Sequence, residues 1–171
     1  TPFYLYIGGE AGTGKSFLLK TMIEAVNKLP KYSGQALNKP YSLTIAPTGV
    51  AAYIVNGSTI ESALGIQPQR RKAYKGNTAS KNSDLRFLYS DLIVIFLDEV
   101  SMVGTDKLTT INLRMQDIMG NNQFMGGVSI VCTGDFGQLP PVKEKMIWSK
   151  SYLDGRVDLS PEYWNEYFKI Y

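Results

Sequence analysis

Residues 9–16 have the types and spacing of a phosphate-binding loop: Gly-Glu-Ala-Gly-Thr-Gly-Lys-Ser matches the pattern G-x-x-x-x-G-K-[ST]. A polyphosphate needs many hydrogen-bond donors in a tight arc, and backbone N–H groups supply them where glycines let the chain bend sharply. From this chemistry we expect Lys15 to reach the β- and γ-phosphates of a nucleotide and Ser16 to ligate Mg²⁺. The predicted nucleotide-binding residues are Gly9, Ala11, Gly12, Thr13, Gly14, Lys15 and Ser16.

A pair of carboxylates, Asp98 and Glu99, directly follows the most apolar run of the chain, residues 92–97. Mg²⁺ prefers oxygen ligands, and hydrolysis of a phosphate needs a base for the attacking water. We predict that Asp98 holds Mg²⁺ through a water molecule, and that Glu99 orients and deprotonates the attacking water. The alternative is a pair of solvated carboxylates at the end of a strand, an interpretation that the phosphate-binding loop weakens.

The third chemical element is the segment 134–142, Gly-Asp-Phe-Gly-Gln-Leu-Pro-Pro-Val. The Gln138 side chain can both donate and accept a hydrogen bond, so it suits a sensor that contacts the γ-phosphate or the attacking water. The predicted catalytic residues are therefore Lys15, Glu99 and Gln138. The segment also fits a rigid turn without a function, because its two prolines would stiffen any loop.

Strands alternate with helices along the chain, and this order predicts a parallel α/β sheet with helices on both faces. We expect strands at residues 3–7, 41–46, 92–97 and 128–133, and each of the three chemical elements directly follows one of them. A helical pattern covers residues 18–29 and ends at Pro30. A second covers residues 108–119, with Asn112, Arg114, Gln116 and Asp117 off its apolar face and Gly120 just past its end. Ser160-Pro161-Glu162 looks like a third helix start.

The composition fits one domain in a reducing, intracellular setting. The chain has 171 residues, a single cysteine (Cys132) and no histidine, so neither a disulfide framework nor a histidine or cysteine metal site is expected. No apolar run approaches the length of a membrane span, and no membrane partner is expected. We assign Cys132, inside a predicted strand, to core packing.

Positive charge is concentrated in residues 66–86, where six basic residues stand against one acidic residue in a chain of net charge +3. The remainder of the chain is therefore slightly acidic. A local basic stretch on a neutral body suggests contact with a polyanion, and a solvated basic loop is the plainer alternative.

The three elements together resemble the petite-integration-frequency (PIF) family of superfamily-one DNA helicases and its RecD-like relatives. Residues 8–16, 46–52, 98–103 and 134–142 are similar to successive motifs of that family, in the same order. The resemblance implies a P-loop NTPase fold with a RecA-like sheet and a small basic insertion between the second and third core strands. It also implies hydrolysis of ATP with Mg²⁺, coupled to 5′-to-3′ movement on single-stranded DNA and unwinding at duplex junctions.

DNA contacts follow from the resemblance alone. The family's motif at residues 46–52 and its Gly-x-Thr-Ile-His-Ser segment lie near the DNA, and a small wedge stands where this chain has residues 66–86. The implied DNA-binding residues are Pro47, Thr48, Gly49, Ser58, Thr59, Arg70, Arg71 and Lys72. The resemblance further implies that residues 1–171 form a single RecA-like lobe of a longer protein, whose second lobe supplies arginines. We expect such a protein to be intracellular: in the nucleus or mitochondrion if it is eukaryotic, and otherwise in the cytoplasm.

Glu61 departs from the family, which carries a histidine at this position. A carboxylate there could repel DNA phosphate. However, Ser58-Thr59-Ile60-Glu61 also fits a capping box, with Ser58 as N-cap and Glu61 bonding back to its N–H. We favour the capping interpretation because it needs no further partner.

Two other classes of function remain open at this stage. One is a P-loop ATPase switch that drives protein assembly without moving a strand, and the other is a nucleic-acid-binding module whose ATPase has decayed. Intact Lys15, Asp98 and Glu99 argue against decay. Phe136, Trp148 and Trp164 could stack on bases, but we assign both tryptophans to the core because large aromatic residues are more often buried.

Overall fold

The structure is a computed structural model that describes residues 1–28, 39–66 and 79–149, together with the short stretches 152–153, 156–157, 164–165 and 168–170. Several predictions fall outside these residues. They are the end of the first helix at Pro30, the helix start at Ser160, and the DNA-contact residues Arg70, Arg71 and Lys72. No helix among the described residues is long and apolar enough to cross a membrane.

The centre of the fold is a six-stranded sheet in which every pairing is parallel. Its strands are β1 (Tyr4–Gly8), β2 (Ser42–Ala46), β3 (Ser58–Thr59), β4 (Val94–Leu97), β5 (Ser129–Gly134) and β8 (Lys169–Ile170). They lie in the order β3-β2-β4-β5-β1-β8, while β6 (Tyr152–Leu153) and β7 (Arg156–Val157) form a separate antiparallel pair. The predicted parallel α/β fold is confirmed, and the four predicted core strands are observed with their ends shifted by one or two residues.

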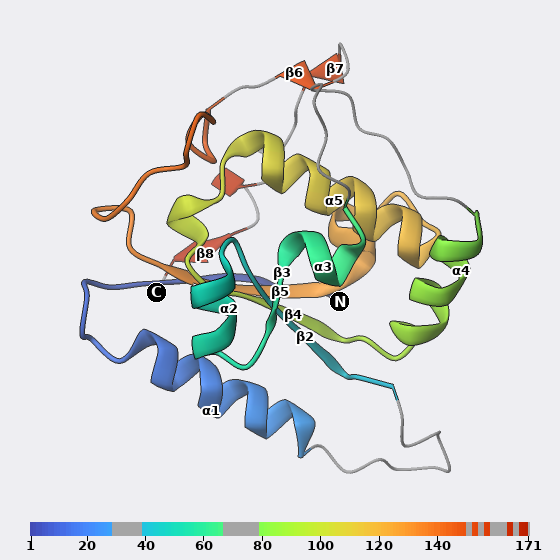
Figure 1. Cartoon of the computed structure of the whole chain (residues 1–171), viewed down its shortest axis with the longest axis horizontal. Coiled ribbons are helices and arrows are strands. Elements are labelled where there is room, and N and C mark those ends of the chain that lie inside the picture. Colours follow the sequence, from blue (N-terminus) through green and yellow to red (C-terminus); the bar gives the residue numbers. More distant parts are fainter. Residues whose placement is uncertain are drawn as a thin grey trace.

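Helices cover both faces of the sheet (Figure 1). The helices α1 (Lys15–Asn27) and α2 (Gly49–Ile54) lie on one face, whereas α3 (Ile60–Leu64), α4 (Ala79–Leu88) and α5 (Thr105–Met119) lie on the other. The pleat of β4 explains this layering. Val94 and Phe96 pack with Leu19 of α1, while Ile95 and Leu97 face the α5 side, so all four residues are buried.

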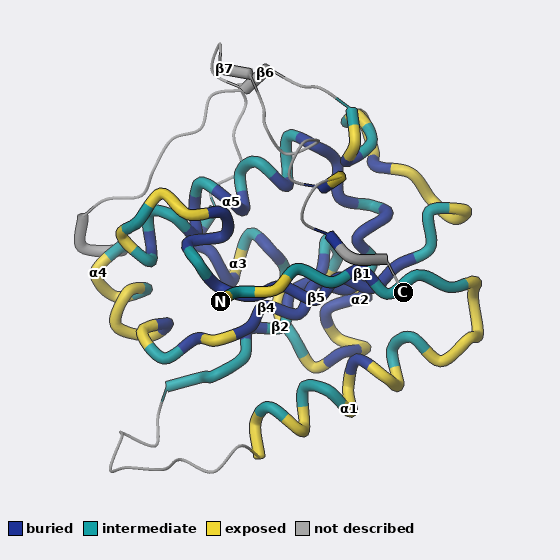
Figure 2. Tube along the Cα trace, turned by 180° about the vertical axis from the view of Figure 1, so that it is seen from behind, coloured by how far each residue is buried: buried dark blue, intermediate teal, exposed yellow. Residues whose placement is uncertain are grey.

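The two faces differ in how completely their helices are covered (Figure 2). Helix α1 has a single fully buried residue, Leu19, and Leu18 of its predicted apolar stripe is exposed. Helix α5 is buried along most of its length, because the short 3₁₀ segment η2 (Phe124–Gly127) and the helices α3 and α4 enclose it beyond the sheet. The fold therefore places its main core on the α5 side.

Not all polar residues of α5 face solvent, because η2, α3 and α4 cover the side of the helix that points away from the sheet. The Asn112 side chain is buried and its Oδ1 accepts a hydrogen bond from the Met125 N–H at 2.8 Å. Arg114 is only 2% exposed, and its guanidinium donates to the Leu64 carbonyl at the end of α3. Helical periodicity identified the face toward the sheet but gave no sign of the elements on the other side of α5.

The insertion between the second and third core strands contains more regular structure than expected. Helix α4 occupies residues 79–88, the last part of the predicted basic segment, and packs on α5. Its Arg86 donates two hydrogen bonds to the Asp117 carbonyl in the last turn of α5, at 3.2 and 2.8 Å. This arginine, which we counted with the polyanion-binding charges, is therefore engaged within the domain.

Candidate nucleotide-binding site

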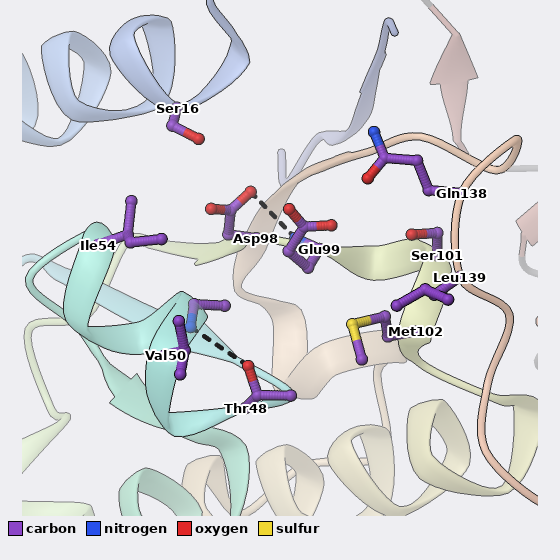
Figure 3. A pocket seen from close by; sticks show the side chains of 11 residues that line it. Ser16, Thr48, Val50, Ile54, Asp98, Glu99, Ser101, Met102, Gln138 and Leu139 are labelled. Carbon is purple, nitrogen blue, oxygen red and sulfur yellow. Dashed lines mark hydrogen bonds between the residues drawn. The ribbon is translucent and has the colours of Figure 1, made fainter. Parts of the chain in front are cut away.

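The three chemical elements meet at the carboxyl edge of the sheet, as parallel strands require. The phosphate-binding loop follows β1, the acidic pair follows β4, and the segment 134–142 continues from β5. One pocket at this edge is lined by residues of all three elements and by residues that follow β2 (Figure 3): Ser16, Thr48, Val50, Ala51, Ile54, Asp98, Glu99, Ser101, Met102, Gln138 and Leu139. Ligands of open parallel sheets bind at this kind of place.

The phosphate-binding loop has the backbone that its glycines predict. Gly12 and Gly14 adopt left-handed φ angles of 79° and 90°, and no neighbouring atom would obstruct a side chain at either position. The glycines therefore serve the path of the backbone rather than close packing. Gly14 is the N-cap of α1 and offers no side-chain hydrogen bond, and the first turn of the helix carries no acidic residue. The N–H groups at the positive end of α1 suit an anion.

Lys15 lies in the loop but points back onto it. Its Nζ donates to the carbonyl oxygens of Gly9 and Glu10 at 2.6 and 2.7 Å, and Lys15 does not line the pocket. Ser16 does line it, on the side of α1 (Figure 3). To reach a nucleotide phosphate, the Lys15 ammonium must leave the two carbonyls to which it now donates.

Asp98 is held rigidly at the end of β4. It is 3% exposed, and its Oδ1 accepts hydrogen bonds from the Thr133 hydroxyl at 2.6 Å and the Glu99 N–H at 3.0 Å. The strand register explains the contact, because Leu97 pairs with Cys132 and the next residues on the two strands are Asp98 and Thr133. Thr133 was not among the predicted site residues. The order of the strands in the sheet, which the sequence does not give, is what brings it to Asp98.

Glu99 lies beside Asp98 in a left-handed conformation, with φ 53° and ψ 44°. Such a backbone is costly for a residue other than glycine and persists where the surrounding structure fixes it. Burial, and secondarily the neighbouring charge of Asp98, raises the pKa of the Glu99 carboxyl, while Lys15 opposes the shift. A carboxylate that is partly desolvated and aimed into a pocket is suited to accept a proton from water.

Gln138 lines the pocket from the opposite side, with its amide tied to its own loop. Its Nε2 donates to Asp135 Oδ2 at 2.9 Å, and the Gly137 N–H donates to the other oxygen of the same carboxylate. These hydrogen bonds, the backbone one first, lower the pKa of Asp135. Asp135 is a second residue that we did not predict, and its hydrogen bond fixes the direction of the Gln138 amide.

The aromatic residues of this loop form a cluster of their own. The Phe136 ring lies 5.1 Å from Tyr6, 4.9 Å from Trp148 and 5.7 Å from Trp164, measured between centroids. Trp164 and Cys132 are buried as predicted. Trp148 is 43% exposed, so the assignment of both tryptophans to the core is wrong for Trp148. Trp148 packs against Phe136 at the solvent-exposed edge of the cluster.

The predicted DNA-contact residues divide into two places. Thr48 follows β2, caps α2 by accepting the Ala51 N–H at 3.2 Å, and lines the same pocket as Ser16 and Asp98. Pro47 and Gly49 flank it in the turn into α2. Ser58 and Thr59 form the outermost strand of the sheet, β3, next to β2.

The capping-box interpretation of Glu61 is wrong. Ser58 belongs to β3, and the N-cap of α3 is Thr59, whose hydroxyl accepts the Ser62 N–H at 3.3 Å. Pairing with β2 keeps the backbone extended through Thr59, so the helix begins one residue later than a capping box at Ser58 requires. Glu61 instead forms an ion pair with Lys107 of α5. The Lys107 N–H in turn donates to Glu144 Oε2 at 3.1 Å, beyond the segment 134–142.

A P-loop sequence, a carboxylate pair and a glutamine side chain at the carboxyl edge of a parallel sheet define a P-loop NTPase domain of the RecA-like kind. The family model described as PIF1-like helicase matches residues 1–167. The chain belongs to the PIF1-like helicase family.

Individual relatives agree with this assignment. The chain is 34% identical over 152 residues to the ATP-dependent DNA helicase PIF1 of Candida albicans, which covers 88% of this chain and 16% of the relative. It is 30% identical over 168 residues to the ATP-dependent DNA helicase Pif1 of a Psychrobacter species, covering 97% of this chain and 24% of the relative. The chain thus spans less than a quarter of either relative.

Solved structures of the family have the same fold. The crystal structure of Pif1 helicase from Bacteroides in complex with ADP-AlF3 and ssDNA matches with a TM-score of 0.62 and 30% identity, over 84% of this chain and 30% of that one. Pif1 helicase from Candida albicans matches with a TM-score of 0.67 and 26% identity, over 99% of this chain and 35% of that one. Both similarities rest on about a third of the solved chain.

Proposed function

We propose that this chain is the ATP-binding and ATP-hydrolysing lobe of a DNA helicase that moves 5′-to-3′ along single-stranded DNA and unwinds duplex junctions. One observation carries the proposal. Ser16, Asp98, Glu99 and Gln138, predicted separately from three motifs, line a single pocket at the carboxyl edge of the sheet. Membership of the PIF1-like helicase family supports DNA as the track, and a solved relative is a complex with both a nucleotide analogue and ssDNA.

Each residue of the pocket has a distinct role in this proposal. The phosphate-binding loop and the N-terminus of α1 bind the phosphates through backbone N–H groups, and Lys15 swings from its loop carbonyls to the terminal phosphates. Glu99 accepts a proton from the attacking water. Gln138 contacts the γ-phosphate or that water after releasing Asp135, and so reports the nucleotide state to the segment 134–142.

The donor set at this site fits a Mg²⁺ ion. Ser16 offers a hydroxyl oxygen and Asp98 a carboxylate in the same pocket, and oxygen donors of this kind suit Mg²⁺. Thr133 and the Glu99 N–H fix one oxygen of the Asp98 carboxylate, which orients the group without a metal. When bound with ATP, Mg²⁺ would neutralise charge on the β- and γ-phosphates.

DNA contact is proposed for two groups of residues. Pro47, Thr48 and Gly49 lie beside the nucleotide pocket, and Ser58 and Thr59 lie at the adjacent edge of the sheet, so both groups could respond to nucleotide state. The basic residues Arg70, Arg71 and Lys72 would add phosphate contacts as part of a small wedge. A second RecA-like lobe of the same protein, which would supply arginines to the γ-phosphate, completes the proposal.

The experiment compares the chain alone with a longer protein that includes the proposed second lobe. We expect residues 1–171 to bind Mg·ATP weakly and to hydrolyse it poorly, since an arginine supplied by another unit is worth roughly 10³–10⁵ in rate in related phosphoryl-transfer enzymes. The longer protein should show DNA-stimulated hydrolysis and should unwind duplexes with a 5′ single-stranded tail in preference to a 3′ tail.

The same experiment tests the alternative functions. Stimulation of hydrolysis by a protein partner and not by DNA would favour an assembly switch. Preference for a 3′ tail would reverse the proposed polarity without affecting the ATPase assignment. The control is Glu99→Gln, which should bind nucleotide and hydrolyse very little. DNA-stimulated turnover that survives Glu99→Gln would place the chemistry elsewhere.

A further inference from the structure

Ser101 carries the one buried side-chain polar atom that has no hydrogen-bond partner among the described residues. The residue is 1% exposed. A buried hydroxyl without a partner is unfavourable, because it loses its hydrogen bonds to water and gains none in return. Native structures rarely tolerate such a group unless something else, such as a bound molecule, supplies the missing partner.

The position of Ser101 indicates where its partner would come from. It lies in the 3₁₀ turn η1 (Val100–Met102), two residues after Glu99, and it lines the pocket on the side where Gln138 and Leu139 approach (Figure 3). The proposed base and the proposed sensor line the same pocket as Ser101.

The main core and strand β5 hold the turn that carries Ser101 in place. The Val100 side chain is buried in the main core. A Cβ at Gly134, the last residue of β5, would lie 3.1 Å from the Val100 nitrogen and 3.2 Å from the Ser101 nitrogen. Strand β5 therefore approaches the turn as closely as a glycine allows. This close contact holds the backbone of the turn in place.

We propose that the Ser101 hydroxyl hydrogen-bonds the water that attacks the γ-phosphate, as a third member of the set formed with Glu99 and Gln138. The inference rests on the proposed function. In the step, the water oxygen forms a bond to the γ-phosphorus, the bond to the bridging oxygen breaks toward ADP, and one proton of the water passes to Glu99. Ser101 Oγ accepts the other hydrogen of that water, which stays on the oxygen, and so directs a lone pair at phosphorus.

The Ser101 hydroxyl is buried, so nucleotide binding must first open a path by which the attacking water reaches it. A water held between Ser101, Glu99 and a bound γ-phosphate would not exchange freely, and fixed polar partners cost no reorganisation during the reaction. Gln138 would join the set when its amide leaves Asp135.

The test uses Ser101→Ala in the longer, DNA-stimulated protein. We expect the KM for ATP and the affinity for ADP to stay within about 2-fold, and kcat to fall by roughly 10- to 10²-fold, as for the loss of one positioning partner. The affinity for ADP–tetrafluoroaluminate, which imitates the transferring phosphoryl group, should fall by about 10-fold or more. Thermal stability should stay the same or rise, because the substitution removes a buried group that has no partner.

A purely structural serine gives a different set of results. Wild-type kcat and analogue affinity in Ser101→Ala would overturn the proposal, and so would a loss of thermal stability, which would show that the hydroxyl has a partner in the protein. Ser90→Ala, at an exposed serine that does not line the pocket, is the control and should change nothing there.

Glu99→Gln separates this inference from the proposed function. If Glu99→Gln loses turnover while Ser101→Ala does not, the site stands and the role of Ser101 falls. If Glu99→Gln retains turnover, the proposed function of the pocket itself is wrong. A Ser101→Ala/Gln138→Ala pair that loses less than the product of the single changes would support one shared water.

Discussion

The fold buries polar side chains in two regions that differ in what satisfies them. At the carboxyl edge of the sheet, Asp98 and Thr133 bond to each other, and Ser101 has no hydrogen-bond partner in the described part of the chain. Between α3, α4 and α5, the Arg114 guanidinium donates to the Leu64 carbonyl, to Asn82 and to Asp117 at 3.1–3.3 Å. The first region is left partly unsatisfied, whereas the second is completed by the protein.

This difference indicates that the carboxyl edge serves ligand binding, whereas the Arg114 region serves the stability of the fold. A buried charge is tolerated when neighbouring groups meet its hydrogen bonds, and Arg114 fastens the end of α3 to α5 in this way. The carboxyl edge instead combines an incomplete hydrogen-bond set with a left-handed Glu99, both of which cost stability. Substitutions at the edge should therefore change nucleotide chemistry with little effect on folding, and substitutions around Arg114 should do the reverse.

The largest effect on the nucleotide side is expected for Lys15→Ala. The change removes the one mobile positive charge of the phosphate-binding loop, so nucleotide affinity should fall by roughly 10²-fold or more. Stability should hardly change, because the Lys15 ammonium donates its hydrogen bonds, within the described residues, to carbonyls of its own loop. Titration with a fluorescent ATP analogue measures the affinity. Lys20→Ala, on the exposed side of α1, is the control, and equal losses in both variants would remove the special role of Lys15.

Glu99→Gln should affect hydrolysis and leave binding nearly intact. The amide keeps the shape of the side chain but cannot accept the proton, so single-turnover hydrolysis should slow by ~10²-fold or more. Equilibrium binding and hydrolysis are measured on the same preparation. Because the left-handed backbone of Glu99 is unchanged by the substitution, the melting temperature should stay close to wild type. A turnover rate equal to that of the wild type would reject Glu99 as the base.

Arg114→Leu should lower stability and leave nucleotide binding unchanged, the opposite of Lys15→Ala and Glu99→Gln. The Leu64 carbonyl loses two donors in a buried place, and the free energy of unfolding should fall by about 2–4 kcal/mol in urea titrations. Arg86→Leu is the matched control, since this exposed arginine also donates to a carbonyl in the last turn of a helix. It should cost about 1 kcal/mol or less. Nucleotide affinity that falls in Arg114→Leu at temperatures where the variant is folded would contradict the separation of the two regions.

The carboxyl edge could be predicted from the sequence because its geometry follows from local patterns. An apolar run marks β4, Asp98 comes directly after it, and parallel strands bring such positions to one edge whatever their order. The residues that complete the edge could not be predicted in this way. Thr133 and Ser101 acquire their roles from strand register and from the close approach of Gly134, which depend on residues far apart in the chain.

The Arg114 region shows a second limit on what can be predicted from the sequence. Periodicity placed Arg114 off the apolar face of α5, but the covering elements α3 and α4 come from another part of the chain. Glu61 shows a third limit, a competition between two local structures. The tetrapeptide beginning at Ser58 suits a capping box, yet pairing of β3 with β2 decides where the helix begins.

Glu61 provides the smallest expected effect and lies between the two regions. Its ion pair with Lys107 connects α3, next to the proposed DNA-contact strand, to the N-terminal turn of α5. The two side chains are 36% and 29% exposed, so solvent screens the pair. Glu61→Gln should lower the free energy of unfolding by about 0.5 kcal/mol, as for other exposed pairs. Chemical denaturation at low and high salt should show the loss mainly at low salt.

A double-mutant cycle with Lys107→Met assigns the cause of that loss. If the ion pair is responsible, Glu61→Gln should cost almost nothing in the Lys107→Met background. A cost that persists there would come from the carboxylate lying in the first turn of α3, near the positive helix end. The same variants measure DNA repulsion in the longer protein. Each single change uncovers the charge of the remaining partner, so single-strand affinity should rise slightly in Glu61→Gln and fall in Lys107→Met. Unchanged affinity in both variants would contradict the repulsion hypothesis and place the pair away from the DNA.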